Sequence, residues 1–180
     1  MRAPSRRMLA APERKVKVWA YPILMLLLIG LGLLVYRHPY SIFVLLAFSI
    51  IAWLSAIIDR RYRLRLAKSR TGESICTFVE AFDCHHTDTW ILRAVYEELS
   101  KFLTVGGSPL PIRADDQCCE RDLKIDPEDL EHLGRRIAHR AHRSMKNTKQ
   151  NPLYGKVKTV RDLVGFFEFQ PGSDEVKPAR

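Results

Sequence analysis

Two long stretches near the N-terminus contain no charged side chain. They read VWAYPILMLLLIGLGLLVY at residues 18–36 and SIFVLLAFSIIAWLSAII at residues 41–58. Each is roughly 18 to 20 residues long, which is the length that a helix needs to cross the hydrocarbon core of a bilayer. A cleaved signal peptide is the alternative for the first stretch, but its apolar run is too long and no small-residue cleavage site follows it. We therefore predict two transmembrane helices.

The two predicted spans are joined only by RHP, at residues 37–39. A connection this short implies an antiparallel hairpin, so both chain ends are expected on the same side of the membrane. Basic residues are numerous before the first span and after the second, whereas Arg37 alone lies between them. Because basic residues favour the cytoplasmic side, we predict an integral membrane protein with two spans and both termini cytoplasmic.

The basic residues beside the spans are predicted to contact anionic lipid headgroups, each charge contributing about 1 kcal/mol near the surface. They are Arg14, Lys15 and Lys17 before the first span, and Arg60, Arg61, Arg63 and Arg65 after the second. Nucleic-acid binding is another interpretation of a chain with a net charge of +9. Aromatic side chains for base stacking do not recur among these residues, however. We expect the lipid bilayer as a partner and no nucleic acid.

The rest of the chain, from about residue 72, is long enough for one small hydrophobic core but not for two. We predict a basic N-terminus at 1–17, the transmembrane hairpin at 18–58, and a basic juxtamembrane linker with a short helix at 59–87. A helical domain follows at 88–170. The last stretch, PGSDEVKPAR at 171–180, has little to bury and is predicted to be disordered. The predicted fold class is all-α.

Two amphipathic helices are predicted before residue 104. The first is short and lies in GESICTFVEAF, at residues 72–82, where Ile75, Phe78, Val79 and Phe82 have helical spacing. A strand is an alternative over so few residues. The second covers residues 89–103, begins after a cap at Thr87 or Asp88, and ends at the paired glycines of VGGSPLP. Its apolar face is formed by Ile91, Leu92, Val95, Leu99 and Phe102.

The stretch DLKIDPEDLEHLG, at residues 122–134, predicts the start of a third helix. Asp126 can cap it, Pro127 suits its first position, and two acidic residues follow at the positive end of the helix dipole. Its core-facing residues are predicted to be Leu130, Leu133, Ile137, Ala138 and Ala141. A last short helix is predicted in TVRDLVGFFEF, where Thr159 and Asp162 have the spacing of a capping box.

The order of these elements resembles the acyl carrier protein fold. A long first helix, a long loop, the entry DLKIDPEDL into a second helix, an irregular segment and a final helix opened by TVRDLV occur in this order between residues 88 and 169. The resemblance implies a small acyl-carrier-like helical bundle after the membrane hairpin. Membrane-anchored proteins that look similar are bacterial, so the resemblance also implies a bacterial inner membrane.

The resemblance also identifies a residue that differs from the carrier pattern. In acyl carrier proteins, the serine directly after the aspartate at this helix start bears phosphopantetheine. Pro127 occupies the matching position, and no side-chain hydroxyl lies between Ser108 and Ser144. Because proline has no nucleophilic group, the resemblance implies a carrier-like domain that carries no acyl group. We expect no cofactor.

The same helix differs from carrier proteins in its charge. In acyl carrier proteins, the second helix is acidic and docks onto basic patches of their enzymes. Here the helix carries the predicted partner-binding residues Arg135, Arg136, Arg140 and Arg143. Charge complementarity therefore favours an acidic protein surface or the anionic membrane as the partner. A solvated basic face without a partner is the alternative.

A catalytic alternative centres on Cys84, His85 and His86 in the stretch DCHH. Adjacent residues rarely all reach one metal ion, and no C-x-x-C motif is present. No base is identifiably placed beside a cysteine nucleophile. We therefore predict a non-catalytic, membrane-anchored interaction or scaffold module, with neither a catalytic residue nor a metal site. A metal-dependent or cysteine-based membrane enzyme, with Cys84 and His86 as ligands, is the alternative.

Overall fold

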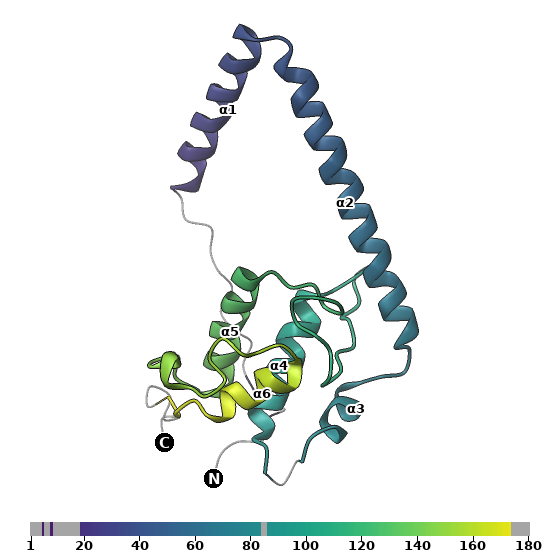
Figure 1. Ribbon diagram of the computed structural model, residues 1–180, viewed down its shortest axis with the longest axis vertical. Coiled ribbons are helices and arrows are strands. Elements are labelled where there is room, and N and C mark those ends of the chain that lie inside the picture. Colours follow the sequence, from purple (N-terminus) through teal and green to yellow (C-terminus); the bar gives the residue numbers. More distant parts are fainter. Residues whose placement is uncertain (1–4, 6–7, 9–18, 84–85, 174–180) are drawn as a thin grey trace. The chain divides into compact units, whose positions relative to one another are not determined.

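The computed structural model describes residues 5, 8, 19–83 and 86–173 (Figure 1). Over these residues the chain is all-helical, with six α-helices, one short 3-10 helix and no strand. It forms two compact units, which are Glu13–Arg63 and Met1–Pro12 together with Leu64–Arg180. We call the first the apolar unit and the second the helical domain.

The apolar unit contains α1 (Ala20–Arg37) and most of α2 (Ser41–Ser69). Its leucines face outward, with Leu26 69% and Leu27 65% exposed. An apolar surface of this extent is unfavourable in water and is typical of helices that face lipid or another apolar surface. Among the described residues, α2 alone is both long and apolar enough to cross a membrane, whereas α1 is apolar but shorter.

Helix α2 continues beyond the predicted end of the second span. It runs for 29 residues to Ser69, or about 43 Å at 1.5 Å per residue, compared with about 30 Å for a hydrocarbon core. Its last residues, 64–69, belong to the helical domain, where Leu66 and Ala67 pack against the core. The expected linker at 59–87 is therefore helical over its first part.

The helical domain contains α3 (Ile75–Glu80), α4 (Thr89–Phe102), α5 (Pro127–Ala141), the 3-10 helix η2 (Thr148–Gln150) and α6 (Val160–Glu168). Helix α4 is central, because it packs against α3, α5 and α6. Ile91, Leu92, Val95 and Leu99 are fully buried on its apolar face. Phe102 was expected on the same face but is 38% exposed, because α4 ends there and Leu103 fills the core instead.

Side-chain caps begin three of these helices as the sequence predicts or permits. Asp88 accepts a hydrogen bond from the Trp90 amide at the start of α4. Thr159 and Asp162 form the predicted capping box at the start of α6, and Ser74 caps α3. Asp126 precedes Pro127 at the start of α5 but makes no side-chain cap hydrogen bond. Proline has no backbone N–H, so a cap at this helix start has one donor fewer to satisfy.

The loop between α4 and α5 forms part of the core, which the sequence did not reveal. Leu110, Ile112, Leu123 and Ile125 are each no more than 2% exposed. Backbone hydrogen bonds join this loop to the start of α6, with Cys118 N donating to Lys158 O, Val160 N to Asp116 O and Arg161 N to Ala114 O. The loop is therefore part of the packed structure that joins α4 to α6.

The C-terminal end of the described chain is also held in place. Ser144 N donates to Pro171 O, and Ser173 N donates to His142 O, each at 2.8 Å. The predicted disordered tail at 171–180 is therefore wrong for residues 171–173, because their backbone pairs with the end of α5. Residues 174–180 lie outside the described part of the chain.

Candidate functional site: charged residues between helices α4 and α5

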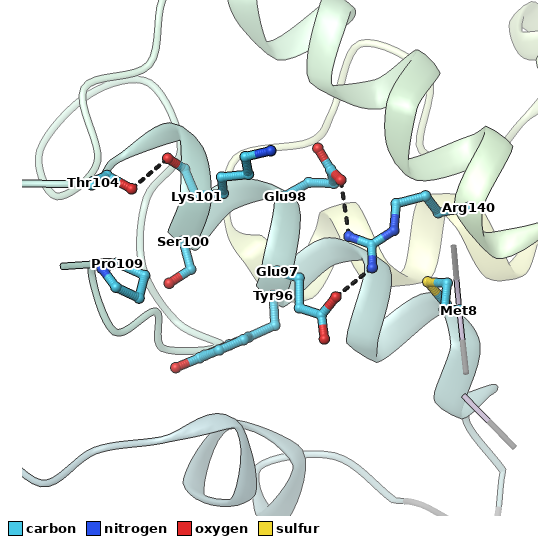
Figure 2. A pocket seen from close by; sticks show the side chains of 9 residues that line it. All are labelled: Met8, Tyr96, Glu97, Glu98, Ser100, Lys101, Thr104, Pro109 and Arg140. Carbon is cyan, nitrogen blue, oxygen red and sulfur yellow. Dashed lines mark hydrogen bonds and ion pairs between the residues drawn. The ribbon is translucent and has the colours of Figure 1, made fainter. Parts of the chain in front are cut away.

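The most prominent polar feature of the helical domain is a buried ion-pair cluster between α4 and α5. Arg140 is 7% exposed and lies between Glu97 and Glu98 (Figure 2). Its Nη1 donates a 2.9 Å hydrogen bond to Glu98 Oε1, and its Nη2 donates to Glu97 Oε2. Arg136 adds a 2.7 Å ion pair to Glu98 Oε2, and Arg93 binds Glu97 at 2.7 Å. Two carboxylates are thus matched by three guanidinium groups.

The cluster affects the acidity of Glu97. Burial alone would raise the pKa of Glu97, but the hydrogen bonds from Arg93 and Arg140 outweigh it and hold the pKa below its usual value. Glu98 is only 2% exposed, and its two carboxylate oxygens pair with Arg136 and Arg140. These groups hold α4 and α5 together, and nothing in their arrangement provides a nucleophile.

The four predicted partner-binding arginines therefore have different positions. The expectation that Arg140 is displayed on the surface is wrong, because it pairs with α4 inside the domain. Arg136 is half-buried on Glu98. Arg143 donates to Asp88 Oδ2 at 3.0 Å and to Gln170 O at 3.1 Å. Arg135 is the most exposed, at 54%, and its ion pair with Glu131 is long, at 3.5 Å.

A basic groove lies beside the C-terminal half of α5. Its volume is about 660 Å³. Cationic groups of Arg135, Arg143 and Lys146 line it, together with His139 and the apolar side chain of Met145. Arg135, His139 and Lys146 are exposed. Of the predicted basic face, Arg135 and Arg143 line this groove, whereas Arg136 and Arg140 do not.

A second cavity, of about 520 Å³, lies along α4 and includes the ion-pair cluster. Tyr96, Ser100 and Lys101 of α4 line it, with Thr104 and Pro109 from the following loop. Met8, from the N-terminal segment, lines the Arg140 side of the cavity, opposite Pro109 (Figure 2). We call this cavity the α4 pocket. It brings together Met8, residues of α4 about 90 positions further along the chain, and Arg140 of α5.

The residues of the catalytic alternative are only partly described. Cys84 and His85 lie outside the described residues. His86 is exposed, and its Nδ1 lies 2.6 Å from Asp83 Oδ2. No group of three or more His, Cys, Asp or Glu residues in the described part of the chain could hold a metal ion. The proposed ligands Cys84 and His86 therefore stay untested.

Cys118 and Cys119, in the loop between α4 and α5, lack the lowered thiol pKa of an activated cysteine nucleophile. Burial raises the pKa of the Cys118 thiol to about 12, and burial followed by the nearby Glu120 also raises the pKa of Cys119. Because the thiolate is the reactive form, a raised pKa keeps these groups as thiols at neutral pH. Cys76 is exposed.

We therefore expect Cys118 to resist alkylation in the folded protein. After brief treatment of the full chain with iodoacetamide at pH 8, peptide mass spectrometry should find Cys76 modified and Cys118 almost unmodified. In urea, where burial is lost, the pKa of Cys118 falls toward about 8.5 and both residues should react at similar rates. Equal reaction rates without urea would contradict the buried position of Cys118.

The remaining predicted positions lie as follows. Arg60, Arg61 and Arg65 are exposed on α2, whereas Arg63 is half-buried and bonds to Asp59 Oδ2 at 3.0 Å. Arg14, Lys15 and Lys17 lie outside the described residues. Pro127 is exposed at the first position of α5, as predicted. Contact of the basic residues with lipid stays a prediction.

No protein-family model, curated protein or solved structure is similar to this chain. The likeness of residues 88–169 to acyl carrier proteins therefore stays a prediction that depends on their motifs.

The sequence contains a signal for the buried cluster that the net charge of α5 does not reveal. Glu98 follows Ile91 by seven positions and Val95 by three, which places it on the apolar face of α4. Arg140 has the same relation to Leu133 and Ile137 of α5. One acidic and one basic residue on the core-facing stripes of two helices indicate a buried ion pair, since neither charge is tolerated there alone.

Proposed function

We propose that this protein is a non-catalytic, membrane-anchored interaction module. One observation carries the proposal: among the described residues, α2 alone is both long and apolar enough to cross a membrane, and its last residues belong to the compact helical domain. Residues 64–69 of this helix are grouped with the domain, and Leu66 and Ala67 pack against its core. The module would hold a partner near the membrane surface.

The proposed topology has two spans, with both chain ends on the cytoplasmic side of a bacterial inner membrane. The basic residues outside α1 and α2 favour this orientation. The packing of Met8 against the core of the helical domain also supports it, because segments on opposite sides of a membrane could not pack together. A single span would separate Met8 from the α4 pocket. The exposed Arg60, Arg61 and Arg65 would contact anionic lipid headgroups.

The partner is proposed to be a protein with an acidic surface, and the basic groove is proposed as its docking site. Arg135, His139 and Lys146 offer exposed positive charge around a partly apolar floor. Opposite charges across an interface steer association and set specificity. Arg136, Arg140 and Arg143 contribute mainly to holding the domain together, because each has a partner within it.

The carrier-like part of the proposal concerns recognition rather than chemistry. Pro127 offers no hydroxyl to phosphopantetheine, so an acyl group could not be attached as in carrier proteins. A carrier-like arrangement of α4, α5 and α6 would then serve as a binding surface whose charge differs from that of true carriers. Enzymes that recognise an acidic second helix would be disfavoured.

We expect charge reversal in the basic groove to remove the partner. In a pull-down from mild detergent, Arg135→Glu with Lys146→Glu should reduce recovery of acidic partner proteins about tenfold, which corresponds to roughly 1.4 kcal/mol. Recovery with the unchanged chain should also fall as salt is raised, because salt screens exposed charges. Quantitative mass spectrometry of the captured proteins measures both effects.

The matched control is Lys156→Glu with Lys158→Glu, which makes the same change in charge at exposed residues that do not line the groove. This control should retain the partner. Reversal of Arg136, Arg140 or Arg143 is unsuitable as a test, because it would place acidic groups beside Glu98 or Asp88. Equal loss of the partner from both double variants would contradict docking in the basic groove.

A further inference from the structure

The basic groove has an open backbone edge along one of its sides. Residues 142–144, which follow α5, run antiparallel to residues 171–173, with Arg143 opposite Gly172. Two backbone hydrogen bonds of 2.8 Å join the segments, one on each side of this pair. Arg143 and Gly172 therefore form a pair in which neither residue uses its own N–H or C=O to bind the other.

The backbone groups of Gly172 are open to another chain. They point away from residues 142–144, and within the described part of the chain neither takes part in a hydrogen bond. Gly172 is exposed and lines the basic groove, and a Cβ added to it would meet no atom within 4 Å. Arg143 differs, because its N–H donates to Ala138 O at 2.8 Å. The edge at Gly172 thus offers one donor and one acceptor, the pair that one residue of an added antiparallel strand would exchange.

The side chains around this edge suit an acidic, extended ligand. Arg135, His139 and Lys146 are exposed and line the same groove, and none of its described lining residues is acidic. Met145 adds an apolar side chain to the lining, and methionine adapts well to other apolar groups. Alternate residues of a strand point to the same side. Acidic residues at positions i and i+4, with an apolar residue at i+2, would therefore all face the groove.

We propose that the basic groove binds an extended acidic segment of the partner protein, which pairs its backbone with Gly172 as an added β-strand. Backbone pairing contributes affinity, and side chains at alternate positions contribute specificity. An acidic helix would satisfy the charges of the groove but not the N–H and C=O of Gly172. This inference rests on the proposed function, because it specifies how the partner occupies the groove.

Two synthetic peptides of the same composition test the binding mode on the full chain in mild detergent. Both are acetylated, amidated and fluorescently labelled. In TETLTET, the glutamates and the leucine lie on one face of a strand, whereas in ETTLTTE their spacing of three places them on one face of a helix. Fluorescence anisotropy should give a dissociation constant at least tenfold lower for TETLTET, and its binding should weaken as salt is raised.

Gly172→Pro is the decisive variant, and Gly172→Ala is its matched control. Proline removes the N–H at a strand edge, where proline is tolerated, whereas alanine keeps the N–H and has space for its Cβ. The dissociation constant of TETLTET should rise about tenfold in Gly172→Pro and less than twofold in Gly172→Ala. Equal binding by the two variants, tighter binding of ETTLTTE, or no binding of either peptide would overturn strand pairing.

A measurement on the unchanged chain does not depend on how Gly172→Pro folds. Saturating TETLTET should slow deuterium exchange of the Gly172 amide at least fivefold, because this N–H becomes a donor to the added strand. The amide of Gly155, an exposed glycine that does not line the groove, should exchange at an unchanged rate. Unchanged exchange at Gly172 would also overturn the inference.

The outcomes separate strand pairing from docking in the basic groove. If Arg135→Glu with Lys146→Glu loses the native partner in the pull-down while Gly172→Pro and Gly172→Ala bind TETLTET equally, the partner docks without adding a strand and this inference alone is wrong. If the double charge reversal retains the native partner, the proposed docking site is wrong as well.

Discussion

Replacing Glu98 with alanine is expected to lower the free energy of unfolding of the helical domain by about 3–5 kcal/mol. Glu98 is 2% exposed and pairs with Arg136 and Arg140. Its removal leaves the Arg140 guanidinium, itself only 6% exposed, with Glu97 as the remaining carboxylate. Because a buried charge that loses its main partner cannot be solvated, the loss far exceeds that of a surface ion pair.

The measurement uses urea unfolding of the full chain in mild detergent. Trp19 and Trp53 lie in the apolar unit, so replacing both with phenylalanine leaves Trp90 as the only tryptophan and restricts the fluorescence signal to the helical domain. Glu131→Ala is the matched control. Its pair with Arg135 is exposed and 3.5 Å long, so we expect a loss below about 1 kcal/mol.

A double substitution distinguishes the loss of the pair from the loss of packing volume. Glu98→Met combined with Arg140→Met replaces the central pair with apolar groups and should recover most of the stability lost in either single variant. Arg136 then keeps its charge at a position that is 38% exposed to solvent. If the single variants unfold at the urea concentration of the unchanged chain, the cluster does not hold α4 to α5.

The second large effect is expected at the end of α2. Arg70 is 4% exposed and binds Asp116 through two hydrogen bonds, of 2.6 and 2.5 Å, and Pro111 O through a third of 2.9 Å. Asp116→Ala would leave this guanidinium buried without its carboxylate. We expect the domain to lose about 3–5 kcal/mol of stability, and the loop around Asp116 to open locally.

Hydrogen–deuterium exchange of the full chain in detergent measures this second effect. Amides at 110–118 and at the start of α6 should exchange at least tenfold faster in Asp116→Ala, because the loop hydrogen-bonds to both Val160 and Arg161. Arg70→Lys should give an intermediate effect, since an ammonium group cannot make the two-pronged contact. The control is Arg113→Ala. It removes the ion pair with Glu73, in which the arginine side chain is 56% exposed. Uniform exchange across all variants would contradict a structural role for Asp116.

The helices of the domain could be predicted well because their signals are local. The cap at Asp88, the capping box of Thr159 and Asp162, and Pro127 at the start of α5 each depend on residues within one turn. The apolar spacing of Leu133, Ile137 and Ala141 identifies a buried face without any knowledge of the partner helix. The all-helical class follows from these patterns.

The candidate site could be predicted only in part because its partners are distant in sequence. Arg140 and Glu98 are separated by 42 positions, and Arg70 and Asp116 by 46. The net charge along α5 predicted an exposed basic face. Packing against α4, however, determines which arginines of α5 are buried. Leu110 and Ile125 were missed for a related reason, since an irregular loop has no period that marks its buried side chains.

The Arg70–Asp116 contact determines where a mechanical load on the anchor would enter the domain. A pull along α2 reaches the domain at Leu66 and Ala67 and then at Arg70, from which Asp116 passes it to the backbone that holds the start of α6. The α4–α5 interface, with its own ion pairs, lies outside this path. In the proposed membrane-anchored arrangement, tension along α2 would therefore strain this loop before it strained the α4–α5 interface.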